Sequence, residues 1–128
     1  MGKITGNFES ENRGQVDLLL GDNEFETGVL TLAASGSVKE GALLKRESNG
    51  NFGVVTDTSN QTPVAVYVGE DITNSSESSA TYPTRAVISG RVAASCCHYS
   101  TNTALSAADK DALRGHSIIA LDAYESGR

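Results

Sequence analysis

The chain has 128 residues, which is enough for one small domain with its own hydrophobic core and leaves little for a second. Its apolar fraction is 38%, aromatic residues make up 5% and tryptophan is absent, so we expect an aliphatic core packed in thin β-sheets. The formal net charge of −6 comes without any cluster of Lys or Arg, which argues against binding to nucleic acid or to an anionic membrane.

The first 28 residues are polar and acidic, and their two basic and six acidic side chains give them a charge of −4. Their apolar residues are too sparse to form a core. We therefore predict an extended N-terminal arm over residues 1–28 and a β-rich domain over residues 29–128. The apolar side chains with which this arm could dock on a partner are Ile4, Phe8, Val16, Leu18, Leu20 and Phe25.

After this arm the pattern changes to short apolar runs separated by turn residues, which is typical of antiparallel sheet. Asn49-Gly50 is the clearest turn signal, because this dipeptide supplies the positive φ angles of a type I′ hairpin. Residues 73–84 are rich in Ser and Thr and contain Pro83, so they predict an exposed loop. Gly90 interrupts a later run and predicts a bulge or a close backbone approach. The predicted strands cover residues 29–32, 41–46, 51–55, 64–68, 85–93 and 116–121.

One helix is predicted near the C-terminus, where Ser106 and Asp109 have the spacing of an N-terminal cap. Gly115 stands where a left-handed C-terminal cap is usual. A helix of about nine residues does not persist alone in water, so it must pack on the sheet, through Ala108, Ala112 and Leu113. The predicted fold class is therefore α+β, mostly antiparallel β, with one short helix near the C-terminus.

The strongest candidate for chemistry is the triplet Cys96-Cys97-His98, which with His116 could ligate zinc or supply a reactive thiolate. In a strand, however, Cys96 and His98 share one face while Cys97 points away, and further ligands have no obvious source. We interpret these residues as reduced thiols and a surface imidazole. No catalytic residue, metal ion or cofactor is expected, and the protein is not expected to be an enzyme.

Three other polar sites have simpler structural interpretations. Glu70 and Asp71 could bind calcium or act as an acid/base pair, but adjacent carboxylates after a strand are usually solvated. Ser106 has no histidine placed nearby to activate it. Arg85 and Arg91 share one strand face if the alternation is unbroken, and they could meet carboxylates at a subunit interface.

The order of the segments is more informative than any single motif. The segments are residues 25–33 (FETGVLTLA), 38–44 (VKEGALL) with the Asn49-Gly50 hairpin, 62–66 (TPVAV), 85–92 (RAVISGRV) and 112–119 (ALRGHSII). In this order they resemble the lambda-type head decoration family of tailed bacteriophages, over roughly residues 25–122.

The resemblance implies a capsid decoration protein: a homotrimer with the compact fold called a β-tulip, on the outer surface of the phage head. Such a protein is made in the host cytoplasm, binds the expanded capsid and reinforces it against internal DNA pressure. The implied partners are the major capsid protein, which the N-terminal arm would contact, and further copies of this chain. Neither nucleic acid nor membrane is an expected partner.

Two readings from other function classes stay open. The first is a phage fibre or spike-like recognition module, in which residues 73–84 would meet a glycan or a host receptor. The second is a small hydrolase or metal enzyme that uses Cys97, His98 and His116.

Overall fold

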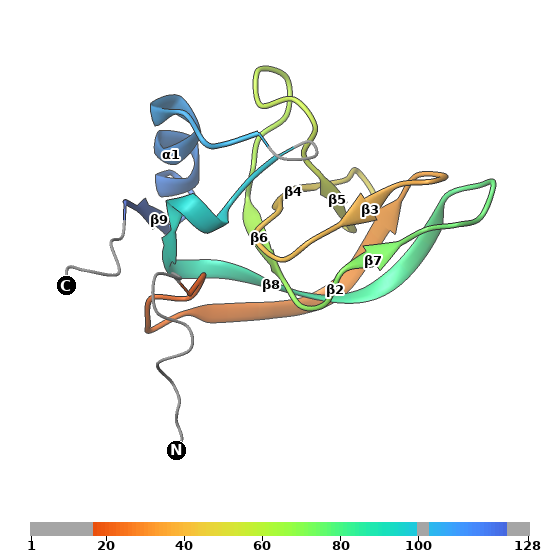
Figure 1. Ribbon diagram of the computed structural model, residues 1–128, viewed down its shortest axis with the longest axis horizontal. Coiled ribbons are helices and arrows are strands. Elements are labelled where there is room, and N and C mark those ends of the chain that lie inside the picture. Colours follow the sequence, from red (N-terminus) through yellow and green to blue (C-terminus); the bar gives the residue numbers. More distant parts are fainter. Residues whose placement is uncertain (1–16, 100–102, 123–128) are drawn as a thin grey trace, which may run out of the picture.

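The computed structural model describes residues 17–99 and 103–122 of the chain (Figure 1). Apolar runs separated by Gly, Asn and Ser turns become strands there, and one helix lies near the C-terminal end. The strands are β2 (Glu24–Leu32), β3 (Ser37–Val38), β4 (Leu43–Arg46), β5 (Phe52–Val54), β6 (Ala65–Val68), β7 (Ile72–Thr73), β8 (Ala80–Ala93) and β9 (Ile118–Leu121). The helices are the short 3₁₀ turn η2 (Ala94–Cys96) and α1 (Ala107–Arg114). This confirms a mostly β domain with one short α-helix near the C-terminus.

Five of these strands close into a small barrel. Strand β2 pairs in parallel with β5 and antiparallel with β8, while β5, β4, β6 and β8 pair antiparallel in that order. Each of the five therefore has a neighbour on both sides, which removes most of the open edge that a flat sheet would expose. Strands β3 and β7 form a separate antiparallel ribbon.

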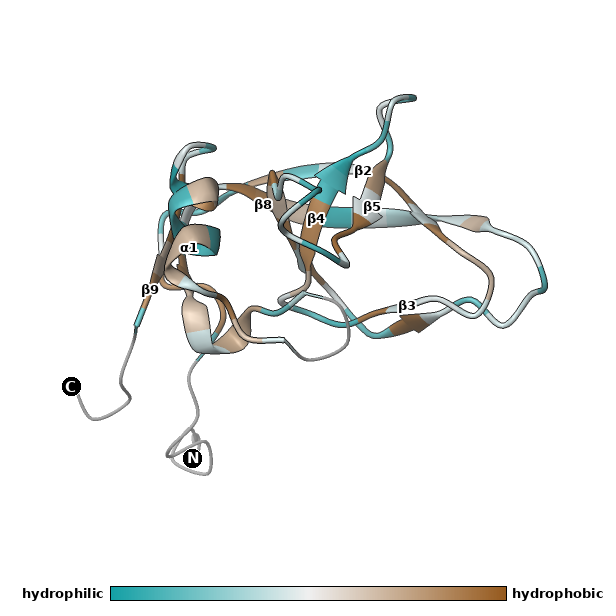
Figure 2. Ribbon diagram, turned by 90° about the horizontal axis from the view of Figure 1, so that it is seen from above, coloured by the Kyte–Doolittle hydropathy of each residue, from teal (hydrophilic) through white to brown (hydrophobic). Residues whose placement is uncertain are grey.

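The remaining strand, β9, extends the sheet beyond the barrel. It pairs in parallel with the last residues of β8, from Gly90 opposite Ile118 to Ala93 opposite Leu121. Figures 1 and 2 both place α1 and β9 together at one end of the molecule, away from the ribbon strand β3.

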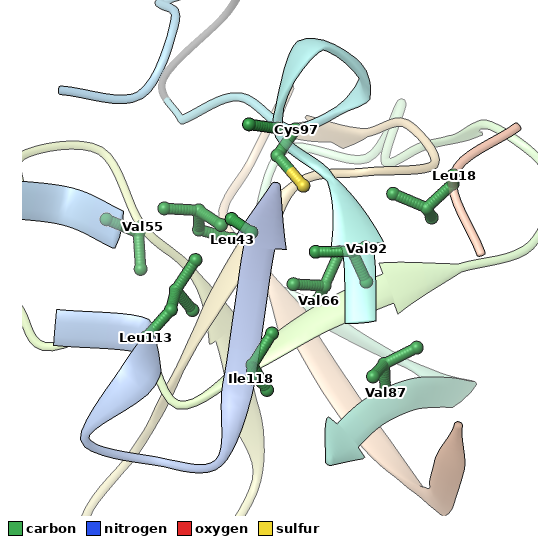
Figure 3. Close-up of a cluster of buried hydrophobic side chains, with 11 residues drawn as sticks. Leu18, Leu43, Val55, Val66, Val87, Val92, Cys97, Leu113 and Ile118 are labelled. Carbon is green, nitrogen blue, oxygen red and sulfur yellow. The ribbon is translucent and has the colours of Figure 1, made fainter. Parts of the chain in front are cut away.

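Strands β4, β5 and β6 carry buried side chains on both faces, which explains their nearly continuous apolar runs, whereas β2 and the first half of β8 also carry exposed side chains. The helix-side cluster lies under α1 and β9 (Figure 3), and it consists of Leu18, Leu43, Val55, Val66, Val87, Val92, Ala94, Cys97, Leu113, Ile118 and Ala120. The ribbon-side cluster lies on the opposite face, and it consists of Leu30, Leu32, Val38, Ala42, Leu44, Phe52, Ala65, Tyr67 and Ala86. Consecutive residues divide between the clusters, as Leu43 and Leu44 do, because side chains alternate across a strand.

The predicted boundary at residue 28 is wrong, because the fold takes in the chain at least from Asp17 onward. Residues 24–28 form the first half of β2 and pair with β8. Leu18 is buried in the helix-side cluster, where it is 7% exposed. The Leu18 carbonyl accepts a hydrogen bond from the Ala93 amide at 2.9 Å, and the Leu20 amide donates to the Arg91 carbonyl at 3.1 Å.

Gly90 confirms the predicted close approach of two backbone segments. Its φ of 124° suits glycine, and a Cβ there would lie 2.9 Å from the Asn23 Cα and 3.0 Å from the Asp22 carbonyl oxygen. The β2–β8 register also shifts nearby, since Glu24 lies opposite Ser89 but Phe25 lies opposite Val87. This bulge lets the chain before β2 cross closely over β8.

Two loop predictions need correction. The Asn49-Gly50 hairpin joins β4 and β5 as predicted, but only Gly50 has a positive φ, at 93°, so the turn is not of type I′. The stretch predicted as a loop over residues 73–84 is shorter, because β8 begins at Ala80 and includes Pro83. Proline is tolerated there because β6 pairs with β8 only from Arg85 onward, which leaves that side of β8 without a partner strand.

The helix α1 has the predicted N-terminal cap. The Ser106 hydroxyl accepts a hydrogen bond from the Asp109 amide at 3.2 Å, and the Asp109 carboxylate accepts one from the Ser106 amide at 2.8 Å. The packing of α1 and the geometry of its C-terminal end differ from the prediction. Leu113 is buried but Ala108 is exposed, and Gly115 has right-handed helical angles while Ser117 takes the positive φ of 70°.

Candidate functional site

The apolar residues predicted for the arm divide between two environments. Leu18 is a core residue and is not free to dock on a partner, whereas Leu20 is half-buried and its docking role stays a prediction. Phe25 is half-buried, with its ring stacked under the Arg85 guanidinium at 3.8 Å. Three other predicted contact residues lie outside the described part of the chain: Ile4, Phe8 and Val16.

The two arginines predicted for an interface do not form a pair. The register shift opposite Phe25 interrupts the alternation between Arg85 and Arg91, so the premise of one shared strand face does not hold. Both residues are exposed, and Arg85 is held over Phe25 by a cation–π contact. A role for either arginine at a subunit interface stays a prediction.

The thiols of Cys96 and Cys97 lie in environments that disfavour the thiolate. Cys97 is 4% exposed in the helix-side cluster (Figure 3), and burial raises the pKa of its thiol to about 12. Burial also raises the pKa of Cys96, which is half-buried. At neutral pH a catalytic cysteine needs a lowered pKa, so this pair lacks the activation that nucleophilic catalysis requires.

We expect Cys97 to resist alkylation in the native protein, because at pH 8 only about one thiol in ten thousand would be ionised with a pKa near 12. Iodoacetamide labelling followed by mass spectrometry should modify Cys96 first and Cys97 only after unfolding. Rapid labelling of native Cys97 at neutral pH would instead show that its thiol is activated, and it would support the alternative that the protein is an enzyme.

The histidines are also separated. His98 is half-buried, and its backbone is fixed by hydrogen bonds from its amide to the Gly41 carbonyl at 3.0 Å and from the Leu43 amide to its carbonyl at 2.9 Å. Burial, followed by the nearby Lys39 ammonium, lowers the pKa of His98. His116 is exposed in the turn after α1. Across the described ranges, no three His, Cys, Asp or Glu side chains come together as a possible metal site.

The other polar candidates take structural roles or stay in solvent. Glu70 and Asp71 are exposed, and the Glu70 carbonyl accepts a hydrogen bond from the Tyr67 hydroxyl at 2.7 Å. Ser106 is engaged in the helix cap. Within residues 17–99 and 103–122, no helix has the length and apolar character needed to cross a membrane.

A cavity of about 540 Å³ lies at the ribbon end of the barrel. Its walls come from the end of β2 and the following turn, from β3, and from β4 and β5 with their flanking residues. Apolar side chains of Leu32, Val38 and Ala42 line it together with Lys39 and His98. Such a volume falls within the range of small-molecule sites.

A second feature is the outer edge of β9. Ile118 and Ala120 face the core, so the alternate residues Ile119 and Leu121 point outward and are 37% and 38% exposed. Among the described strands, β9 pairs only with β8, so its other edge presents unpaired backbone groups beside apolar side chains. These are the features of a surface that accepts another strand.

No family model and no curated protein matches this chain. What the protein does must therefore be argued from its own residues.

Sequence reasoning missed both the cavity and the β9 edge as sites. The cavity is assembled from segments up to about 65 residues apart, between Thr31 and His98, so no local motif marks it. The β9 edge did carry a signal, since Ile118-Ile119-Ala120-Leu121 contains more apolar residues than one buried strand face needs.

Proposed function

We propose that this protein is a capsid decoration protein that binds the outside of the expanded phage head as a homotrimer and reinforces it against internal DNA pressure. In this proposal its partners are the major capsid protein and two further copies of the chain, the barrel is of the β-tulip kind, and the site of action is the virion surface.

The observation that best supports the proposal is the correspondence between sequence segments and structural elements. The segments that carry the family resemblance fall on successive elements of the fold: residues 25–33 cover most of β2, residues 85–92 lie within β8, and residues 112–119 run from the end of α1 into β9. The resemblance therefore follows the order of the elements along the chain.

The chemistry of the domain points in the same direction. The buried Cys97 has a strongly raised pKa, His98 and His116 lie apart, and Ser106 caps a helix. The described residues thus offer backbone edges and apolar contacts but no assembled catalytic group. In this proposal the protein acts by binding, which is what reinforcement of a shell requires.

In this proposal the N-terminal capsid-binding arm is shorter than the sequence pattern predicted. Because Leu18 is a core residue, the proposal assigns capsid binding to the residues that precede it, with Ile4, Phe8 and Val16 as apolar contacts. The exposed Ile119 and Leu121 of the β9 edge are the second surface assigned to subunit contact. Three linked copies would raise the effective concentration of weakly binding arms.

We expect the full-length protein to decorate purified expanded heads and to raise their resistance to heat or osmotic shock. Removing residues 1–16 should weaken this binding at least about a hundredfold, because strand addition and three-arm avidity are lost together. Electron microscopy of decorated heads and sedimentation of the free protein test the stoichiometry. A stable dimer in both settings, or full decoration by the truncated protein, would contradict the proposal.

The recognition-module reading has one observation in its favour, which is that Ser79, in the shortened loop before β8, borders the cavity. Binding to intact host cells, compared with binding to purified heads, separates the two functions. Cell binding without head binding would favour the recognition module.

A further inference from the structure

The cavity at the ribbon end is rigidly built, and the buried amide of Asn74 is the reason. Asn74 is 1% exposed, and its Nδ2 donates to the carbonyls of Leu32, Ala33 and Ser78 at 3.0–3.1 Å. Its backbone amide also donates to the Gly36 carbonyl at 2.8 Å. One side chain thus ties the turn after β2 to the loop before β8, and both of these segments line the cavity.

The opposite wall is fixed by the backbone bonds of His98 to Gly41 and Leu43 described above. A cavity with both walls held in this way loses little conformational freedom when a ligand binds, and this favours a specific site over an adaptable surface.

The charges that line the cavity leave one cation uncompensated. Lys45 lies 3.9 Å from Glu47, and these two side chains neutralise each other. The Lys39 ammonium is exposed and forms no ion pair or hydrogen bond with the described part of the chain, and its charge is felt by the His98 imidazole, as is the opposite charge of Asp71. A ligand with one negative charge is therefore the electrostatic complement of the cavity.

The uncharged lining has two parts. The exposed Ala33 and the half-buried Val54 provide an apolar floor that a ligand can reach, and Leu32, Val38 and Ala42 support it with exposed fractions of only 1–3%. At the rim stand the hydroxyls of Ser35, Ser37 and Ser79, which make no hydrogen bond to other residues of the described ranges. An apolar floor below free hydroxyls suits a ring that has C–H faces and several hydroxyl groups.

We propose that this cavity binds a sugar acid, a hydroxyl-rich ring that carries one carboxylate. The carboxylate pairs with Lys39, the hydroxyls exchange hydrogen bonds with the serine rim, and the ring lies on the apolar floor. This inference concerns a different surface from the β9 edge and residues 1–16, so it does not depend on capsid binding.

The test uses the full-length protein with D-glucuronate, D-glucose and inorganic phosphate as separate probes, followed by two-dimensional NMR. Glucuronate should produce saturable shifts at Gly36, Val38 and Ala42, and should bind at least about tenfold more tightly than glucose or phosphate. Glucose has the same ring without the carboxylate, and phosphate has the charge without the ring, so the three probes separate the two contributions.

Lys39→Gln should weaken glucuronate binding about tenfold. The control is Lys110→Gln, which removes a lysine of α1 that is paired with Asp122 and should change glucuronate binding less than about twofold. Lys39 is exposed, so its substitution should leave the thermal midpoint nearly unchanged. The proposal is overturned if no saturable shifts occur, if they map away from the cavity, or if Lys39→Gln has no effect. Equal binding of glucose would exclude recognition of the carboxylate, and equal binding of phosphate would exclude recognition of the ring.

Discussion

Removing residues 1–24 is expected to lower the free energy of unfolding by about 3–6 kcal/mol more than removing residues 1–16 does. The longer deletion removes the buried Leu18 side chain, and it also removes the bonds from Leu20 and Asn23 to the Arg91 carbonyl, at 3.1 and 2.9 Å. It therefore opens the helix-side cluster to water. Urea unfolding followed by circular dichroism measures the difference.

A point substitution isolates the side-chain part of this effect. Leu18→Ala should cost about 2–4 kcal/mol, because a buried leucine is replaced by a cavity. The matched control, Leu121→Ala, removes a leucine that is 38% exposed and should cost about 1 kcal/mol or less. Equal stability of the two truncated proteins would mean that residues 17–24 do not belong to the fold.

The second large effect is expected at Gly41, where substitution by alanine should lower the free energy of unfolding by about 3–5 kcal/mol. Gly41 has a φ of 95°, and a Cβ on it would overlap the carbonyl oxygen of Cys96. Its backbone cannot shift easily, because its amide donates to the Tyr67 carbonyl at 2.9 Å and its carbonyl accepts from the His98 amide at 3.0 Å.

Gly50→Ala is the control for the backbone angle alone. Gly50 has nearly the same φ, 93°, but no atom lies within 4 Å of the position of its missing Cβ. Its substitution should therefore cost only about 1–2 kcal/mol, the penalty for a left-handed conformation. Thermal or urea unfolding of the two variants separates steric overlap from backbone strain, and equal losses would mean that the segment around Cys96 adapts freely.

The elements that could be predicted from the sequence are those specified by neighbouring residues. The α1 cap depends on Ser106 and Asp109, which are three positions apart, and the turn between β4 and β5 depends on Gly50. The strand over residues 65–68 is a run of apolar side chains with no polar interruption. Gly90 also predicted the close approach of a second backbone segment to β8, because glycine in a strand often marks such a place.

The candidate sites were predicted less well, because they depend on residues that are far apart in the chain. The pKa of Cys97 is raised mainly by its burial in the helix-side cluster, which brings together residues distant in the chain such as Val92 and Leu113, and only secondarily by the neighbouring Cys96. The cavity likewise needs Asn74 to join two turns that are about 40 residues apart.

Only the tertiary structure showed that residues 18–28 belong to the domain. Residues 17–28 have few apolar side chains, and their composition alone predicts part of an extended arm. They fold because β8 is long enough to pair with β2 from Glu24 to Leu32 and to receive Leu18 and Leu20 farther along. This segment is thus stabilised by backbone hydrogen bonds and by the burial of Leu18, and both depend on a partner more than 50 residues away in the chain.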